Sequence, residues 1–306
     1  MERRVIVIVG ATCSGKTSLA LKLADKINTE IISADSRQIF KFLDIGTAKP
    51  SKNELSKIKH NFIDSLNPTE SFNVSRYETE SLKIIDDLQK SGKIPIVVGG
   101  SGLYIKAIVE GLFNEVDTDM EYRKQLLEER EKFGNEFLYQ KLISIDKISA
   151  EAMVPQNWKR VIRALEVFYL TGEPIWKFHQ EHKREVEIDF LQYGLQWDRE
   201  LLYKNINDRV DLMISTGLEN EVRSLLEKGY SPELNSLNTV GYKEMISYIN
   251  GEYDLDRAIE LIKRNSRHYA KRQMTWFRKD DRINWFEITT EKEINKIADL
   301  IIKDIK

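Results

Sequence analysis

The segment VIVIVGATCSGKT, residues 5–17, constrains the fold more than any other part of the chain. Its first five residues are branched and apolar, which is typical of a strand buried on both faces in a parallel sheet. The spacing G-x-x-x-x-G-K-T then runs from Gly10 to Thr17, and a helical pattern follows. A strand, a glycine loop and a helix in this order predict a phosphate-binding loop, whose backbone N–H groups and helix N-terminus hold phosphate oxygens. In such a loop Lys16 reaches a terminal phosphate and the Thr17 hydroxyl ligates Mg²⁺.

Composition narrows the class of protein further. The chain has 306 residues, 41% hydrophobic and 31% charged, which suits one large or two ordinary globular domains. Its apolar runs are far shorter than the ~20 residues of a membrane helix, and we interpret the N-terminal run as a strand and not as a signal peptide. The single cysteine, Cys13, excludes an internal disulfide and a multi-cysteine zinc site, and favours a cytoplasmic location.

Two further strands end in residues that suit a ligand site. The strand predicted over residues 30–34 ends at Asp35, and ligands of open α/β sheets bind at the carboxyl ends of strands. Asp35 is therefore a candidate for chemistry, although local sequence alone favours a capping role for an Asp-Ser pair. The strand predicted over residues 94–98 leads into Gly99-Gly100-Ser101-Gly102, whose glycines permit close approach to a ligand. This second strand lacks the acidic residue typical of nucleotide-hydrolysing proteins, which favours a site that binds a diphosphate.

These patterns predict an α/β fold: a P-loop core with a mostly parallel sheet flanked by helices, plus an inserted all-helical domain. We expect the core to comprise residues 1–115 and 199–306, with the insertion over residues 116–198. Residues 257–282 hold nine Lys or Arg against three acids, a local net charge of +6. On a helix Arg264, Arg267, Lys271 and Arg278 share one face, which could bind a phosphate backbone or simply be solvated.

Six blocks occur in an order that closely resembles the bacterial tRNA dimethylallyltransferases. They are GATCSGKTSLA, ADSRQIFKFLDIGTAKP, GKIPIVVGGSGLYIKAIVEGL, RVIRALEVFYLTGEP, VGYKE and RHYAKRQMTWFR. The resemblance covers nearly the whole chain. It implies transfer of the dimethylallyl group of dimethylallyl diphosphate to the exocyclic amine of the adenosine immediately 3′ of the anticodon of tRNA. Diphosphate is released, Mg²⁺ is required, and the enzyme is expected to be a monomer whose insertion clamps the anticodon stem-loop.

The resemblance also implies roles for individual residues. Asp35 would accept the proton of the amine, Ser101 would contact the prenyl–oxygen end of the diphosphate, and Arg209 would reach the diphosphate from the other side, with Lys16 and Thr17 completing the catalytic set. The diphosphate would bind to Gly10, Ala11, Thr12, Cys13, Ser14, Gly15, Lys16 and Thr17, with Mg²⁺ on Thr17. The tRNA would contact Asp35, Ser36, Arg37, Gln38, Ser101, Arg123, Lys159, Arg160, Val161, Ile162, Arg163, Asn238, Thr239, Val240, Gly241, Tyr242, Lys243, Lys271, Arg272, Gln273, Met274, Thr275, Trp276, Phe277 and Arg278.

Several positions depart from the family pattern without removing a group that the chemistry needs. Cys13 stands where alanine is usual, Ser101 replaces a threonine, Phe40 replaces a tyrosine, and Asn61 replaces the second histidine of a pair. Three other functions fit parts of the chain: a small-molecule P-loop kinase, an isopentenyltransferase that modifies free AMP or ADP, and an RNA-binding module without activity. The basic region argues against the free-nucleotide enzyme, because a mononucleotide does not need such a surface.

Overall fold

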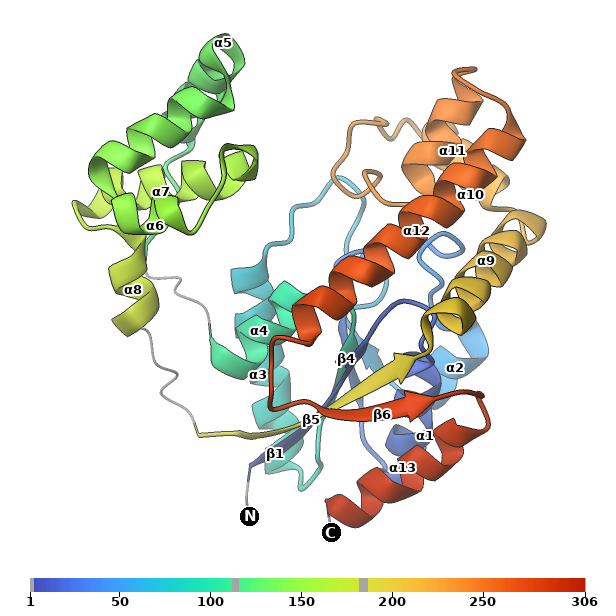
Figure 1. Cartoon of the computed structure of the whole chain (residues 1–306). Helices are drawn as coiled ribbons and strands as arrows, with labels where there is room; N and C mark the ends of the chain where they lie inside the picture. Colours follow the sequence, from blue (N-terminus) through green and yellow to red (C-terminus); the bar gives the residue numbers. More distant parts are fainter. Residues whose placement is uncertain (1–2, 112–115, 182–186, 306) are drawn as a thin grey trace. The chain divides into compact units, whose positions relative to one another are not determined.

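The computed structural model describes residues 3–111, 116–181 and 187–305, and its core is a sheet of six strands (Figure 1). The strand order is β3-β2-β4-β1-β5-β6, and every pairing is parallel. The strands are β1 (Arg4–Gly10), β2 (Ile31–Ala34), β3 (His60–Asn61), β4 (Ile96–Gly99), β5 (Asp189–Trp197) and β6 (Asn284–Ile288). The predicted fold class is confirmed.

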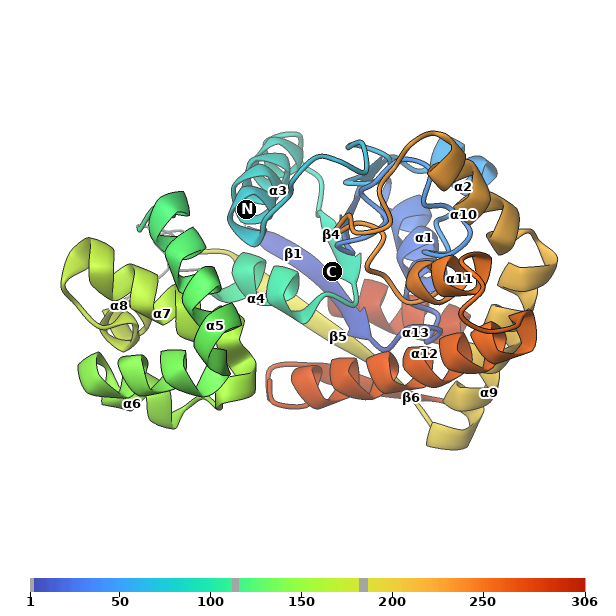
Figure 2. The same ribbon diagram turned by 90° about the horizontal axis from the view of Figure 1, so that it is seen from above.

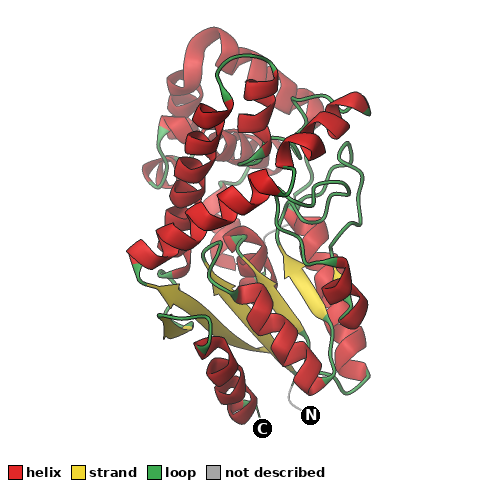
Figure 3. Cartoon of the chain, turned by 90° about the vertical axis from the view of Figure 1, so that its right-hand side faces the viewer, coloured by secondary structure: helices red, strands yellow, loops and turns green. Residues whose placement is uncertain are grey.

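Helices cover both faces of this sheet (Figure 3). The alternation along β1 explains why, because Val5, Val7 and Val9 join one apolar cluster while Ile6 and Ile8 join another. The second cluster is closed by α1 (Lys16–Ile27) and α13 (Glu293–Asp304), which pack together (Figures 1 and 2). The first contains residues of α3 (Val74–Lys90), α4 (Gly102–Glu110), α9 (Arg199–Ser215), α10 (Leu218–Glu227), α11 (Tyr242–Ile249) and α12 (Leu255–Phe277).

The short strand β3 ends at Asn61, before Phe62. Phe62 and Asp64 adopt φ angles of 65° and 50°, in the left-handed region, so the chain turns there. The preceding helix, α2 (Lys52–Lys57), begins at a capping box formed by Ser51 and Glu54.

Residues Glu110–Glu185 form a second compact unit with its own apolar core. It contains α5 (Met120–Ile145), α6 (Lys147–Glu151), a 3₁₀ turn (Pro155–Asn157), α7 (Trp158–Thr171) and α8 (Ile175–Glu181). Gly134, with φ 86°, interrupts the helical backbone within α5. The expected end of the insertion at residue 198 is wrong, because β5 pairs with β1 from Asp189 onward and belongs to the core.

A buried carboxylate organises this helical unit. Glu166 of α7 is fully buried, and its Oε2 accepts hydrogen bonds from Arg123 Nη2 at 2.6 Å and Arg163 Nη1 at 2.8 Å. Arg163 Nη2 also donates to the carbonyl of Val116 at 2.8 Å. The two arginines, expected to contact RNA, therefore hold the start of the unit to α7.

Replacing Glu166 with alanine should destabilise the helical unit by about 3–5 kcal/mol, because it leaves two cations without their buried partner. Glu173→Ala is the matched control, since Glu173 forms only an exposed i,i+4 pair with Lys177 and should cost about 0.3–0.5 kcal/mol. Hydrogen exchange of the amides of α7 measures both effects. Equal protection in the two variants would contradict a structural role for Glu166.

Candidate active site

The loop of residues 10–17 follows β1 and has the expected phosphate-binding form. Gly10 has φ 146°, and a Cβ there would lie 2.8 Å from the carbonyl oxygen of Leu195, so the position requires glycine. Gly15 has φ 88° and precedes the first residue of α1, Lys16, so the loop ends at a helix N-terminus. Trp197 Nε1 supports the loop from behind by donating to the carbonyl of Ser14 at 3.0 Å.

Two cavities meet beside this loop. The first, of about 150 Å³, is lined by residues 12–17 and by side chains that follow β2 and β4. The second, of about 320 Å³, lies between α9, α12 and the segment 238–243. Their walls have several residues in common: Thr12, Cys13, Asp35, Thr47, Arg209 and Tyr269. A molecule in one cavity can therefore reach a molecule in the other beside these side chains.

Asp35 lies at this junction, directly after β2. Its Oδ1 accepts hydrogen bonds from the backbone N–H groups of Arg37 at 2.8 Å and Gln38 at 3.3 Å. In the described parts of the chain its Oδ2 accepts no hydrogen bond. The capping role suggested by local sequence is therefore real but occupies one oxygen, and the other is available to a ligand.

Arg209 reaches the same junction from α9. Its Nη1 donates to Thr12 Oγ1 at 3.0 Å and to Cys13 Sγ at 3.6 Å, and its Nη2 donates to the carbonyl of Thr47 at 3.4 Å. These contacts hold a guanidinium against the loop of residues 10–17. The sequence identified Arg209 by resemblance alone, because nothing in its local pattern indicates that it meets residues almost two hundred positions earlier.

Lys16 is directed back over its own loop, where its ammonium donates to the carbonyl of Ala11. Burial, partly offset by the nearby Cys13, lowers the pKa of Lys16 to about 8. A bound anion would favour the protonated amine and raise this pKa again.

We therefore expect diphosphate binding to take up a proton around pH 8. Below this pH Lys16 is already charged and affinity is insensitive to pH; above it, affinity should fall by up to about tenfold per pH unit. Calorimetry with dimethylallyl S-thiolodiphosphate, in buffers of different ionisation enthalpy, measures both quantities. The Lys16→Met variant shows how ionisation of the ligand itself affects binding. Identical pH profiles for this variant and wild type would contradict proton uptake by Lys16.

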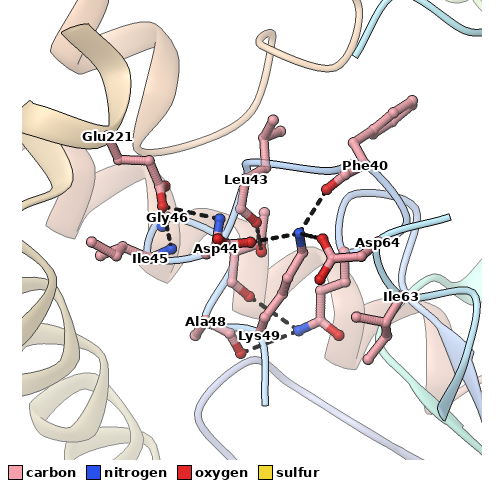
Figure 4. Close-up of polar contacts among 12 residues, drawn as sticks. Phe40, Leu43, Asp44, Ile45, Gly46, Ala48, Lys49, Ile63, Asp64 and Glu221 are labelled. Atoms are coloured by element: carbon pink, nitrogen blue, oxygen red, sulfur yellow. Dashed lines mark hydrogen bonds and ion pairs between the residues drawn. The ribbon is translucent and has the colours of Figure 1, made fainter. Parts of the chain in front are cut away.

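The segment 40–49 contributes to the walls of both cavities and is held by two charged side chains (Figure 4). Glu221 of α10 accepts hydrogen bonds from the N–H groups of Asp44, Ile45 and Gly46 at 2.8–3.1 Å. Lys49, whose side chain is 4% exposed, donates to the carbonyl of Phe40 and to the carboxylates of Asp44 and Asp64. Local sequence does not indicate this role for Glu221, since the charge pattern of its own helix resembles that of any solvated helix.

The glycines at the end of β4 also serve the packing of the protein. A Cβ on Gly99 would meet the carbonyl of Ala34, a Cβ on Gly100 would meet Gln273, and a Cβ on Gly102 would meet Trp276. The glycines therefore allow β2 and α12 to pack closely against this segment. Gly99 and Gly100 line the first cavity, whereas Ser101 is not part of its wall.

A family model described as IPP transferase matches residues 38–280 of this chain. The chain belongs to the IPP transferase family. The tRNA dimethylallyltransferase of Acetivibrio thermocellus is 47% identical over 305 residues, covering 99% of this chain and 96% of that relative. Among solved structures, the full-length tRNA isopentenylpyrophosphate transferase of Bacillus halodurans has a TM-score of 0.72 at 37% identity, covering 99% of this chain and 96% of the other. A eukaryotic dimethylallyltransferase acting on tRNA has a TM-score of 0.83 at 30% identity, with coverages of 98% and 77%.

The family resemblance seen in the sequence is thus confirmed.

The residues predicted to contact RNA fall into an exposed and a buried group. Exposed cations occur on α7 at Lys159 and Arg160, and on and beside α12 at Lys271, Arg272 and Arg278. The buried members of the predicted set are Val161, Ile162, Tyr242, Gln273 and Phe277. None of the helices within the described ranges is both long and apolar enough to cross a membrane.

Proposed function

We propose that this protein transfers the dimethylallyl group of dimethylallyl diphosphate to the exocyclic amine of the adenosine 3′-adjacent to the anticodon in tRNA. The observation that supports it most is the meeting of the two cavities at Asp35 and Arg209. One cavity has the anion-binding loop that a diphosphate needs, and the other is large enough for a nucleobase. The names of the relatives supply the identity of the donor group and of the acceptor RNA.

The first cavity suits the leaving diphosphate. During transfer the bond between the allylic carbon and the diphosphate oxygen breaks, and its electron pair leaves with the diphosphate. The loop N–H groups, Lys16 and Arg209 would stabilise the negative charge that develops on the leaving oxygens. The same contacts bind the donor before reaction, so the arrangement serves both binding and catalysis.

The second cavity suits the acceptor adenine. Its walls combine apolar residues of α9 and α12, including Ile206 and Ile262, with the cations Arg37, Lys243 and Arg272. An adenine in an anticodon loop must leave its stack to enter such a cavity. As the amine nitrogen bonds to the allylic carbon it gives up a proton, and Asp35 Oδ2 lies where it can accept that proton.

The residues around Thr17 fit a magnesium ion that arrives with the donor. Thr17 lies in the exposed first turn of α1 and lines the first cavity. No group of three His, Cys, Asp or Glu side chains suited to a metal occurs among the described residues. Mg²⁺ commonly binds with few protein ligands and completes its shell with substrate phosphates and waters. Bound through Thr17, it would supply positive charge to the diphosphate.

The decisive experiment supplies purified protein with labelled dimethylallyl diphosphate, magnesium and an unmodified anticodon stem-loop. We expect label in the RNA and release of diphosphate. AMP as acceptor and labelled ATP as donor are run in parallel. Transfer to AMP in preference to RNA would identify the free-nucleotide enzyme, transfer from ATP alone would identify a kinase, and RNA binding without any transfer would leave only a binding module.

The exposed basic face of α12 should carry part of the RNA affinity. Replacing Arg264 and Lys271 with alanine is expected to weaken stem-loop binding and to reduce the slope of log affinity against log salt by about 0.7–0.9 per lost phosphate contact. Arg267 is unsuitable, because its Nη1 already donates to Asn207 Oδ1 at 2.7 Å. Fluorescence anisotropy measures the slopes, with Lys296→Ala and Lys303→Ala on α13 as a charge-matched control. Equal slopes would mean that this face is only solvated.

A further inference from the structure

Gln273 of α12 joins the two loops that border the first cavity. Its Oε1 accepts the N–H of Thr12 at 2.8 Å, and its Nε2 donates to the carbonyl of Gly100 at 3.0 Å. The side chain is 6% exposed and lines the first cavity. Thr12 follows β1 and Gly100 follows β4, two neighbouring strands. One amide therefore connects the ends of two strands at the candidate active site.

The chemistry of the two bonds is specific to an amide. Gln273 must present an acceptor and a donor at once, which a carboxylate cannot do because it only accepts. An apolar side chain of similar length would leave the Thr12 N–H and the Gly100 carbonyl without their partner, and buried polar groups left in this way are costly. A Cβ on Gly100 would lie 2.0 Å from Nε2, so the amide can approach this closely only because the residue is glycine.

The Thr12 peptide that Gln273 holds is itself part of the reacting arrangement. Thr12 Oγ1 accepts the hydrogen bond from Arg209 Nη1, and Thr12 lies in the walls of both cavities. Its N–H is already engaged, so Thr12 does not contribute that group to the phosphate cradle. A shift of this peptide would move the Arg209 contact and the loop N–H groups that follow it.

We propose that Gln273 is a positioning residue for prenyl transfer and not a contact of the tRNA. It holds the loop of residues 10–17 and the loop after β4 in one fixed relation, so that the leaving-group contacts are aligned before the donor binds. This inference rests on the proposed function for its kinetic consequences. The alignment of the anion-binding loop by Gln273 does not depend on that function, and it can be tested by diphosphate binding in the absence of RNA.

Gln273→Glu and Gln273→Met together test the proposal. The ionised glutamate cannot donate to Gly100, whereas the protonated glutamic acid reproduces both bonds of the amide. We expect the single-turnover rate of Q273E at saturating RNA to be roughly 10²-fold below wild type at about pH 8. The rate of Q273E divided by that of wild type should rise as the pH falls towards about 5. The reason is that burial raises the pKa of a glutamate, so that the side chain becomes protonated in this range. Q273M should show the defect at every pH.

Q273M also separates alignment from charge. If a negative charge near the diphosphate were the only problem in Q273E, the neutral methionine variant would react at the wild-type rate, and that result would overturn the proposal. A flat ratio for Q273E across the pH range would overturn it too, as would normal single turnover combined with weakened stem-loop affinity. Gln89→Glu is the matched control, because Gln89 of α3 makes its contacts with Arg3 and Arg4, away from both cavities.

Calorimetry with inorganic pyrophosphate keeps this test independent of the proposed function. Measured without RNA, the affinity of Q273E relative to wild type should also recover as the pH falls, and that of Q273M should not. If the wild-type protein fails to modify tRNA while this pattern appears, the proposed function fails and the positioning role stands. If wild type modifies tRNA but both variants bind pyrophosphate and react normally, only the positioning role fails.

Discussion

Asp35→Asn is expected to lower the single-turnover rate of prenyl transfer by about 10²–10⁴-fold, the range for loss of a positioned general base. This substitution separates loss of the base from loss of the cap, because asparagine keeps an oxygen that accepts hydrogen bonds from the N–H groups of Arg37 and Gln38. The local turn is thus retained while the proton acceptor is removed. Rapid-quench measurement with saturating stem-loop RNA reports the chemical step, and anisotropy should show unchanged RNA affinity.

Two further variants complete this test. Asp35→Ala removes both the cap and the base, so its additional loss over Asp35→Asn measures what the turn contributes. Asp254→Asn changes an aspartate with the same kind of capping bond, to the N–H of Arg257 at the start of α12, and should retain activity. A nearly normal rate for Asp35→Asn would return Asp35 to a purely structural role.

Arg209→Gln should reduce kcat/KM for the donor by roughly 10²–10³-fold, the cost of removing a donor aimed at developing negative charge. Arg209→Lys should remain strongly impaired, because an ammonium cannot reproduce a planar fork that spans Thr12, Cys13 and Thr47. Steady-state kinetics with varied donor and saturating RNA measures both. Arg223→Gln, which removes an exposed ion pair with Glu219 on α10, is the control.

Whether the substitution of Arg209 changes kcat or KM identifies the role of this residue. A loss mainly in kcat places its interaction in the transition state, whereas a rise in KM alone would indicate uniform binding of the donor. Unchanged values of both constants would show that the guanidinium only ties α9 to the loop of residues 10–17.

Local sequence predicted the parts of the site that come from continuous segments. The spacing from Gly10 to Thr17 requires glycine for its backbone angles, and the structure has the loop that this spacing predicts. The placement of Asp35 at a strand end followed from the buried run before it. In both cases the sequence pattern and the structure that it predicts lie within about a dozen residues, so no tertiary information is needed.

Local sequence could not separate buried from exposed residues within the predicted RNA-binding stretches. On α12, Lys271 and Arg272 are exposed while Gln273, the next residue, is buried between two loops. On α7, Lys159 and Arg160 are exposed while Arg163 pairs with the buried Glu166. A family motif covers every residue of such a stretch. Whether one of these residues can contact RNA depends on which side of the helix it occupies.

By itself the sequence determined the strand–loop–helix unit at the start, the parallel α/β class and the presence of a helical insertion, because each follows from short-range periodicity and backbone preference. Only the tertiary structure decided which distant groups complete the site. Glu221, Arg209 and Gln273 reach it from α10, α9 and α12. The physical reason is that a parallel sheet brings the carboxyl ends of its strands to one edge. The helices packed there supply side chains whose local sequence does not indicate that they meet.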